Sequence, residues 1–256
     1  MAAVVRAALR RPIAQAIRRS NHIMHQASRW EDTVPGGPPI SKLDGPGIAL
    51  LQRRLDNAAN QGTPTHMQFK YPGKKPPAEA AVYLLLCSVN GKPSVLFEER
   101  HNKLSSHSGE ACFAGGKADD MDGSLVGTAI REAVEELGIV SGDIQTIGYL
   151  PPVPSKDHRL RVHPFVGVLR STVDPRALSI NREEVHRAFA LPLDHFYDPR
   201  KRSLMRFRNS TISIPAYESD KSGLTIWGLT AFILHEFLRR VSDPRNDGNG
   251  SSAPKL

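Results

Sequence analysis

Apolar and polar positions along the middle of the chain predict a sheet of several strands. The stretch AAVYLLLCSV, residues 80–89, is almost wholly apolar and predicts a buried strand. Asn90–Lys92 (NGK) has the composition of a hairpin turn, and PSVLFEER, residues 93–100, predicts the returning partner. Further strands are predicted at EACFAGGK (110–117), IQTIGYLPPV (144–153), RVHPFVGVLR (161–170) and a hairpin at MRFRNSTISIPAY (205–217).

Helical periodicity lies between and after these strands. Ser124 as N-cap and Gly138 just after the last turn predict the limits of one helix. Residues 225–241 predict a terminal amphipathic helix, and REEVHRAFALPLDHF, residues 182–196, a short helical or bent connector. Strands with helices interspersed indicate an α/β domain with a mixed sheet over residues 77–241.

The helix that begins near Ser124 carries an unusual concentration of acids. At about 100° per residue, the apolar side chains fall opposite the carboxylates, so we expect an apolar stripe to anchor the helix. Surface helices commonly offset an acid with a base four residues on, but Glu132 meets Glu136 at that spacing. A solvated acidic face is the simpler alternative. The apolar stripe is Ile130, Val134 and Leu137, and the acids are Glu132, Glu135 and Glu136.

The segments outside the domain have distinct compositions. Residues 1–30 hold six arginines and no acid, with apolar positions spaced by four, which is typical of a mitochondrial transit peptide; a disordered basic tail is the alternative. Residues 31–76 predict a Pro/Gly linker with a short helix at residues 48–59. Residues 242–256 predict a disordered polar tail, whose final PKL is a weak match to a peroxisomal address.

Charge and cysteine content limit the classes of function. Without the six leader arginines the formal net charge falls from +8 to +2, and aromatic residues make up 6%, so nucleic-acid binding is not expected. The longest apolar run, residues 80–87, is too short to span a bilayer. Cys87 and Cys112 form no disulfide framework, and both are expected as small core residues.

A longer motif surrounds the acidic helix. The stretch GGKADDMDGSLVGTAIREAVEELGI, residues 115–139, resembles the box of the Nudix family, G-x5-E-x7-R-E-U-x-E-E-x-G-U, where U is a bulky aliphatic residue. Two features depart from that pattern: Asp122 stands at the first acidic position, one residue further from the arginine, and small Ala133 replaces a bulky aliphatic residue. The matching residues are Gly116, Arg131, Glu132, Glu135, Glu136, Gly138 and Ile139.

The preceding stretch narrows the resemblance. LFEERHNKLSSHSGEACFAGGK, residues 96–117, is similar to the signature of the coenzyme A diphosphatase subgroup. VHRAFALPL (185–193) and IWGLTAFI (226–233) further on resemble the same subgroup, especially its mitochondrial animal-type member. Ala114 stands where the subgroup usually has proline, and Ser105 where it usually has a second arginine. The corresponding residues are Arg100, Leu104, His107, Gly109, Phe113, Gly115 and Gly116.

The resemblance implies a fold and a reaction. The fold would be the Nudix α/β/α sandwich around a mixed sheet, and the reaction hydrolysis of coenzyme A and acyl-coenzyme A to 3′,5′-ADP and (acyl-)4′-phosphopantetheine. Mg²⁺ or Mn²⁺ would be the cofactor, because hard cations prefer carboxylate oxygens. The implied site residues are Glu132, Glu136 and Glu135 for the metal, Glu132, Glu135 and Arg131 for catalysis, and Arg100, His107, Gly115, Gly116 and Lys117 for the substrate.

Several alternatives stay open from the sequence. Another nucleoside diphosphate derivative could be the substrate, or the chain could be a catalytically silent nucleotide-binding module, although such modules usually lose the glutamates kept here. Glu183 and Glu184 could add a metal ligand or base, or could simply be acids at a helix N-terminus. The role of Asp122, the acyl-chain preference and the oligomeric state are not determined.

Overall fold

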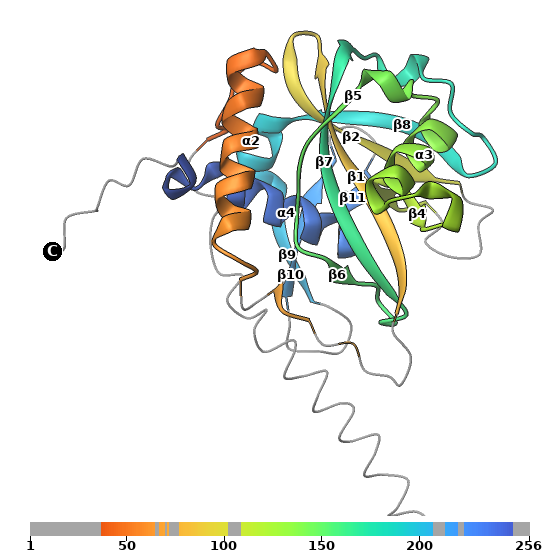
Figure 1. The fold of residues 1–256 in the computed structure, drawn as a ribbon. Helices are drawn as coiled ribbons and strands as arrows, with labels where there is room; N and C mark the ends of the chain where they lie inside the picture. The colour runs from red at the N-terminus through yellow and green to blue at the C-terminus, as the bar shows by residue number, and fades with distance from the viewer. Residues whose placement is uncertain are drawn as a thin grey trace, which may run out of the picture.

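The protein is described by a computed structural model covering residues 37–64, 67–69, 71, 77–101, 109–206, 213–219 and 223–247 (Figure 1). The predicted leader, residues 1–30, and the candidate substrate-binding residue His107 lie outside these residues. Within the described part of the chain, no helix is long and apolar enough to cross a membrane.

A long hairpin forms the centre of the main sheet. Strand β1 (Ala78–Val89) and strand β2 (Lys92–Arg100) pair antiparallel from Val89↔Lys92 to Leu85↔Leu96. Asn90 and Gly91 between them have φ of 51° and 76°. Two successive positive φ angles are what a tight hairpin turn requires, so the predicted NGK turn is confirmed.

The glycine segment is wedged between the diverging ends of this hairpin. Strand β3 (Ala111–Cys112) pairs with the end of β2, whereas strand β4 (Ala114–Lys117) pairs with the start of β1. Both pairings are antiparallel. Because β1 and β2 run in opposite directions, β3 and β4 also run in opposite directions, so the chain turns at Phe113. The segment predicted as one short strand is therefore two, and its glycines are held inside the sheet.

The rest of the sheet flanks this centre on both sides. Strand β7 (Leu160–Thr172) runs parallel to β1, while the other pairings are antiparallel, so the predicted mixed sheet is confirmed. Strand β8 (Val185–Pro192) pairs along β2. Residues 182–196 were expected to be helical or bent, which is wrong for β8, because hydrogen bonds to β2 outweigh local helix propensity there. Strands β5 (Ile144–Tyr149) and β6 (Val153–Pro154) pair with β7.

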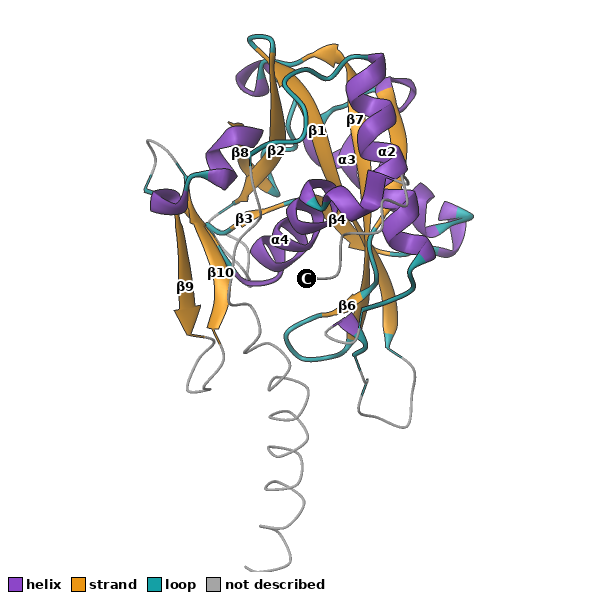
Figure 2. Ribbon diagram, turned by 90° about the vertical axis from the view of Figure 1, so that its left-hand side faces the viewer, coloured by secondary structure: helices purple, strands orange, loops and turns teal. Residues whose placement is uncertain are grey.

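A smaller sheet and the last helix complete the domain (Figure 2). The predicted hairpin is confirmed as β9 (Arg202–Arg206) pairing with β10 (Ser213–Glu218), which also pairs with β11 (Thr225–Ile226). The terminal helix α4 spans Gly228–Ser242. Short 3₁₀ turns lie at Asp120–Asp122, Ser141–Asp143, Pro175–Ala177, Leu193–Tyr197, Pro199–Lys201 and Pro244–Asp247.

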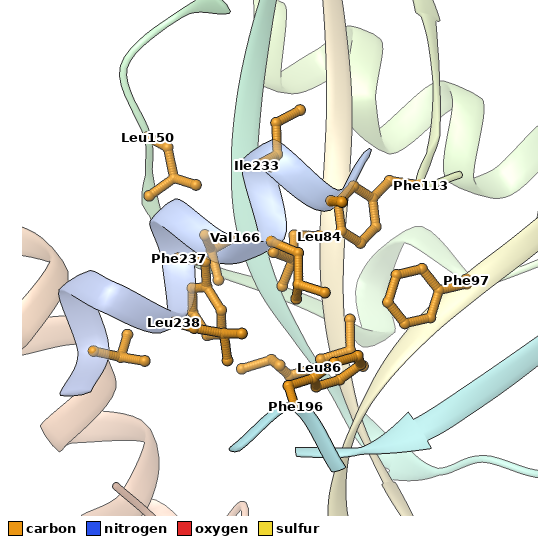
Figure 3. Close-up of a cluster of buried hydrophobic side chains, with 14 of the residues drawn as sticks. Leu84, Leu86, Phe97, Phe113, Leu150, Val166, Phe196, Ile233, Phe237 and Leu238 are labelled. Carbon is orange, nitrogen blue, oxygen red and sulfur yellow. The ribbon is translucent and has the colours of Figure 1, made fainter. Parts of the chain in front are cut away.

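Alternating residues of β1 divide the interior into two cores. Leu84 and Leu86 belong to the core that α4 and helix α2 (Gly45–Asn60) cover, in which Figure 3 shows Phe97, Phe113, Ile233 and Phe237 gathered around Leu84. Ala81, Tyr83 and Leu85 belong to the core on the opposite face, covered by helix α3 (Leu125–Leu137). Helices on both faces of a mixed sheet make the expected α/β/α sandwich.

Helix α2 lies within residues 31–76, for which a linker with a short helix was predicted. Leu51 and Leu55 are fully buried in the main core. Arg54 forms a two-point ion pair with Asp247, Nε to Oδ1 at 2.6 Å and Nη2 to Oδ2 at 3.0 Å. The helix is thus an integral part of the described domain.

The first residues of the predicted tail also pack. Asn246 is buried and its side chain donates a hydrogen bond of 2.8 Å to the carbonyl of Arg240. The prediction of a disordered tail from residue 242 is therefore wrong for residues 242–247, because the residues at this end of the chain form hydrogen bonds with α2. Residues 248–256 lie outside the described part.

Candidate active site

Helix α3 has both of its predicted ends. The Ser124 side chain accepts a hydrogen bond from the N–H of Gly127 at 3.1 Å. Gly138 has φ of 64°, and its N–H donates to the carbonyl of Val134. A polar cap at the start and a left-handed glycine at the end hold the helix in a fixed register.

The buried face of α3 differs from the predicted one. Ala129 and Ala133 are fully buried against the sheet, whereas Val134 is 38% exposed and Ile130 is only partly buried. The expectation that Val134 anchors the helix is therefore wrong. Of the predicted stripe, Leu137 is buried and Ile130 packs against the core from a partly buried position. The reason is that alanines allow a close approach to β1 and β4, which hydrophobicity alone does not predict.

This rotation separates the three glutamates. Glu136 is buried, the side chain of Glu132 is 14% exposed, and that of Glu135 is 55% exposed. The acids do not share one solvated face. Instead, the helix directs one carboxylate into the protein, one to its edge and one to solvent.

Glu136 contacts the glycine segment and Arg100. Its Oε2 accepts a hydrogen bond of 2.9 Å from the N–H of Gly115, and its Oε1 lies 3.8 Å from Nη1 of Arg100. Burial, followed by the negative charge of Glu98, raises the pKa of Glu136 well above the usual value.

Glu98 is an additional acid that the sequence analysis did not single out. It is fully buried on β2, and its Oε1 accepts a hydrogen bond of 3.2 Å from the thiol of Cys112 and lies 4.0 Å from Nη1 of Arg100. Its Oε2 is buried and has no hydrogen-bond partner among the residues that the structure describes. Burial raises the pKa of Glu98 from 4.5 to about 7. Alternation along β2 could have revealed it, because Leu96, Glu98 and Arg100 share one face.

Arg131 connects the other two box glutamates to Asp122. Its guanidinium contacts Glu132 at 3.0 Å, Glu135 at 2.9 Å and Asp122 at 2.7 Å. Asp122 also accepts hydrogen bonds from the N–H of Asp119 and the hydroxyl of Thr128. These hydrogen bonds hold the pKa of the Asp122 carboxyl group far below its usual value, and the bond from Arg131 is the largest cause. Asp122 therefore holds Arg131, and Arg131 orients the glutamates beside it.

The two glycines leave no room for side chains. A Cβ at Gly116 would overlap the carboxyl group of Glu132, and one at Gly115 would overlap the carbonyl oxygen of Ala81 and the backbone of Val82. Their lack of a side chain lets β4 approach both α3 and β1.

A cavity of about 590 Å³ opens beside this segment. Arg100, Cys112, Gly115, Gly116 and the exposed Lys117 line its polar side. Glu132 and Glu136 are not part of the lining, and contact the two glycines from the direction of α3. The structure thus brings Glu132, Glu136 and the described substrate-binding candidates together, with the two glycines between the acids and the cavity. Glu135 is joined to this group through Arg131.

Glu183 and Glu184 lie in a turn before β8 and not at a helix N-terminus, so that alternative is wrong. Burial is the largest cause of the raised pKa of both Glu98 and Glu132, and the charge of Glu184 adds to it. Glu184 is exposed, and its Oε1 lies 3.5 Å from Nδ2 of Asn181. Glu183 is exposed, and its N–H donates to the side chain of Asn181.

The donor set fits a hard divalent cation. Carboxylate oxygens of Glu98, Glu132 and Glu136 lie around one region, and the unpartnered Oε2 of Glu98 is an acceptor with no donor. Among the described residues, however, no three His, Cys, Asp or Glu side chains are already arranged as a set of metal ligands. Glu132 instead contacts Arg131, and Glu136 the N–H of Gly115.

Comparison with known proteins identifies relatives of the whole domain. The NUDIX domain family matches residues 76–208. The mitochondrial coenzyme A diphosphatase NUDT8 of Homo sapiens is 35% identical over 184 residues, which cover 70% of this chain and 74% of that protein. An uncharacterized Nudix hydrolase, NudL, of Pectobacterium atrosepticum is 31% identical over 70% of this chain and 93% of its own length.

Other matches are partial or more distant. A probable nudix hydrolase of Schizosaccharomyces pombe is 31% identical over 66% of this chain, and the match spans 58% of that protein. Among solved structures, a MutT/nudix family protein from Enterococcus faecalis is 16% identical with a TM-score of 0.40, over 77% of this chain and 72% of that one.

Proposed function

The chain belongs to the NUDIX family and is a Nudix hydrolase, and from this premise we propose that it hydrolyses the diphosphate bond of coenzyme A and acyl-coenzyme A. The products would be 3′,5′-ADP and (acyl-)4′-phosphopantetheine. The observation that carries the proposal is the position of Gly115 and Gly116 between Glu132 and Glu136 on one side and the cavity on the other.

Two further observations favour coenzyme A over other nucleoside diphosphate derivatives. The similar human protein is named a mitochondrial coenzyme A diphosphatase. The segment before the box resembles the signature of that subgroup, and its residues Arg100, Gly115 and Gly116 line the cavity. A nucleotide sugar or a dinucleoside polyphosphate remains the competing substrate class.

Nudix hydrolases generally use divalent metal ions, and we assign Mg²⁺ or Mn²⁺ to this site. Glu132 and Glu136 would hold the cation, with Glu135 sharing the cluster or acting as the base. A bound cation neutralises phosphate oxygens and lowers the pKa of a water molecule. Arg131 forms ion pairs with Glu132 and Glu135 and so holds both side chains in place. Less side-chain freedom would then be lost when these glutamates bind the cation.

The remaining site residues contact the substrate in this proposal. The ammonium group of Lys117 has no hydrogen bond or ion pair within the described residues, so it is available to a phosphate at the cavity mouth. Arg100 and Lys156 are the other cations of the lining, and His107 is proposed as a further contact from outside the described part. The substrate is a small molecule and not a nucleic acid.

A substrate panel tests the proposal. The full-length protein is incubated with Mg²⁺ or Mn²⁺ and coenzyme A, acetyl-coenzyme A, ADP-ribose, a dinucleoside polyphosphate or a nucleoside triphosphate, and the products are identified by mass. We expect 3′,5′-ADP from both coenzyme A substrates. Hydrolysis of ADP-ribose or a triphosphate, with coenzyme A left intact, would disprove the substrate assignment but not the family.

We also propose a mitochondrial location, on the strength of the arginine-rich leader and the mitochondrial human relative. A fluorescent protein fused to the C-terminus leaves the leader free and masks the final PKL. Fluorescence in mitochondria is the expected result. Exclusion of this fusion from mitochondria, with peroxisomal signal from an N-terminal fusion, would support the peroxisomal alternative instead.

A further inference from the structure

The cavity has an apolar side that the family box does not supply. Its floor includes Val82 and Val162, on the face of the sheet that α4 covers. Its wall comes from β9, β10, the start of α4 and the bend between β3 and β4 (Figure 2). The apolar wall consists of Phe113, Met205, Ile214, Trp227, Leu229 and Ile233.

Several of these side chains are left partly open to the cavity. Met205 is 40% exposed, and Ile214, Trp227 and Leu229 are half-buried. Trp227 stands at the N-cap of α4, but its side chain makes no capping hydrogen bond. Apolar side chains that line a cavity and are incompletely covered indicate a surface that binds an apolar group.

The same cavity therefore has two chemically different regions. Arg100, Lys117 and the two glycines suit the diphosphate, and Glu110 and Lys156 are the other charged residues of the lining. The six residues of the apolar wall, Trp227 among them, have uncharged side chains. A volume of about 590 Å³ is within the usual range of small-molecule sites, about 300–1,000 Å³. A ligand with phosphates at one end and a neutral, apolar group at the other matches this division.

The two halves of the proposed substrate differ in the same way, because one half carries a phosphate and the other half is uncharged. The nucleotide half carries a 3′-phosphate, which suits the lining cations Arg100, Lys117 and Lys156 and would be desolvated unfavourably against the uncharged side chains of the apolar wall. The pantetheine half is uncharged and ends in the thiol or its acyl group. We propose that Trp227, with Ile214 and Leu229, forms a subsite for the acyl chain and makes acyl-coenzyme A a better substrate than free coenzyme A. This inference rests on the proposed function.

A chain-length series tests the subsite. The kcat/KM of the full-length protein is measured for free, acetyl-, hexanoyl- and decanoyl-coenzyme A below their micelle-forming concentrations. Burial of each methylene corresponds to about a fourfold gain, so kcat/KM is expected to rise with chain length until the cavity is filled. In Trp227→Ala, the ratio of kcat/KM for decanoyl- to free coenzyme A is expected to fall at least fivefold, mainly through KM.

Two further variants separate this effect from a general loss of folding. Tyr149→Ala replaces an aromatic side chain that is 58% exposed and outside the cavity lining, and it should leave the ratio unchanged. Met205→Glu, on the partly exposed β9, places a charge in the wall and should lower the ratio as Trp227→Ala does.

The possible failures are distinguishable. If the wild-type protein hydrolyses free and acylated coenzyme A equally, or if Trp227→Ala lowers all substrates by one factor, the acyl subsite is wrong and the proposed function stands. If the wild-type protein hydrolyses no coenzyme A species but cleaves another nucleotide, the proposed function fails and the subsite fails with it.

Discussion

Gly115 and Glu136 are joined by a hydrogen bond of 2.9 Å from the glycine N–H to the buried carboxylate. The bond ties β4 to α3 and fixes the distance between the cavity lining and the acidic helix. Because Glu136 is buried and bonded to Gly115, the fold itself holds its carboxyl group in place. The function of the site therefore depends on the packing of α3 as much as on its carboxylates.

Removing the charge of Glu136 should separate activity from folding. Glu136→Gln keeps the size of the side chain but removes a proposed metal ligand, so turnover should fall by at least about 100-fold, since even outer-shell changes at metal sites cost about 10–100-fold. The metal-free melting temperature should be equal or higher, because the neutral amide has no ionised form that burial would disfavour. The measurements are the initial rate and the melting temperature with and without Mg²⁺.

The matched control is Asp56→Asn, on the exposed side of α2. It should keep both the activity and the rise in melting temperature on adding Mg²⁺. Wild-type turnover by Glu136→Gln would show that this carboxylate is not a metal ligand.

Gly116→Ala should damage the site without unfolding the domain. The added Cβ would overlap the carboxyl group of Glu132, which is the flexible end of a side chain and can move aside. Affinity for Mn²⁺, followed by electron paramagnetic resonance, should fall about tenfold or more, with little change in melting temperature. Gly142→Ala has nothing within 4 Å of the new Cβ and should behave as wild type. Equal Mn²⁺ affinity in both variants would contradict the assignment of Glu132.

The buried face of α3 can be tested by two substitutions one residue apart. Ala133→Leu adds volume where the helix packs closely on the sheet, and should destabilise the protein by about 1–3 kcal/mol or more. Val134→Thr changes a side chain that is 38% exposed and should shift stability by less than about 0.5 kcal/mol. Urea unfolding measures both. A larger loss of stability for Val134→Thr than for Ala133→Leu would mean that Val134, as the apolar pattern predicted, lies on the anchoring face.

The metal-free protein should lose stability as pH rises from about 4.5 to 7. The pKa of Glu98 is raised from 4.5 to about 7 in the folded state, so the folded protein binds more protons than the unfolded chain in this window. Stability gained from the protonated form is present at the acidic end and lost as the pH passes the raised pKa. Glu98→Gln should flatten the pH profile of the melting temperature measured with a chelator present. An unchanged slope would mean that Glu98 keeps an ordinary pKa.

Helix α2 should contribute to the stability of the whole domain. Leu55→Ala empties a fully buried position next to Gly148 and should destabilise the protein by about 2–5 kcal/mol. Arg53→Ala, two residues earlier on the exposed side of α2, is the control and should have little effect. Equal unfolding midpoints for the two variants would mean that α2 is only loosely attached.

Short-range signals allowed a large part of the fold to be predicted. The Asn90–Gly91 turn, the limits of α3 at Ser124 and Gly138, and the strands of the central hairpin depend on neighbours in the chain. The box itself was recognisable because its residues lie within one loop and one helix. These features follow from backbone preferences and hydrogen bonds over a few residues, which a single sequence displays directly.

Long-range contacts decided the rest. Residues 185–192 form a strand because β2 offers them hydrogen-bonding partners, although their composition also suits a helix. Ala129 and Ala133 are the fully buried residues of α3, whereas the larger Ile130 packs at the edge of the core and Val134 is exposed, because close approach improves packing more than side-chain size does. Glu98, Glu136 and Arg100 come together only when β2 and α3 meet across the glycine segment. By itself, the sequence determined the local elements and the family motif, whereas the tertiary structure decided which faces are buried and which acids share one site, because burial depends on segments far apart in the chain.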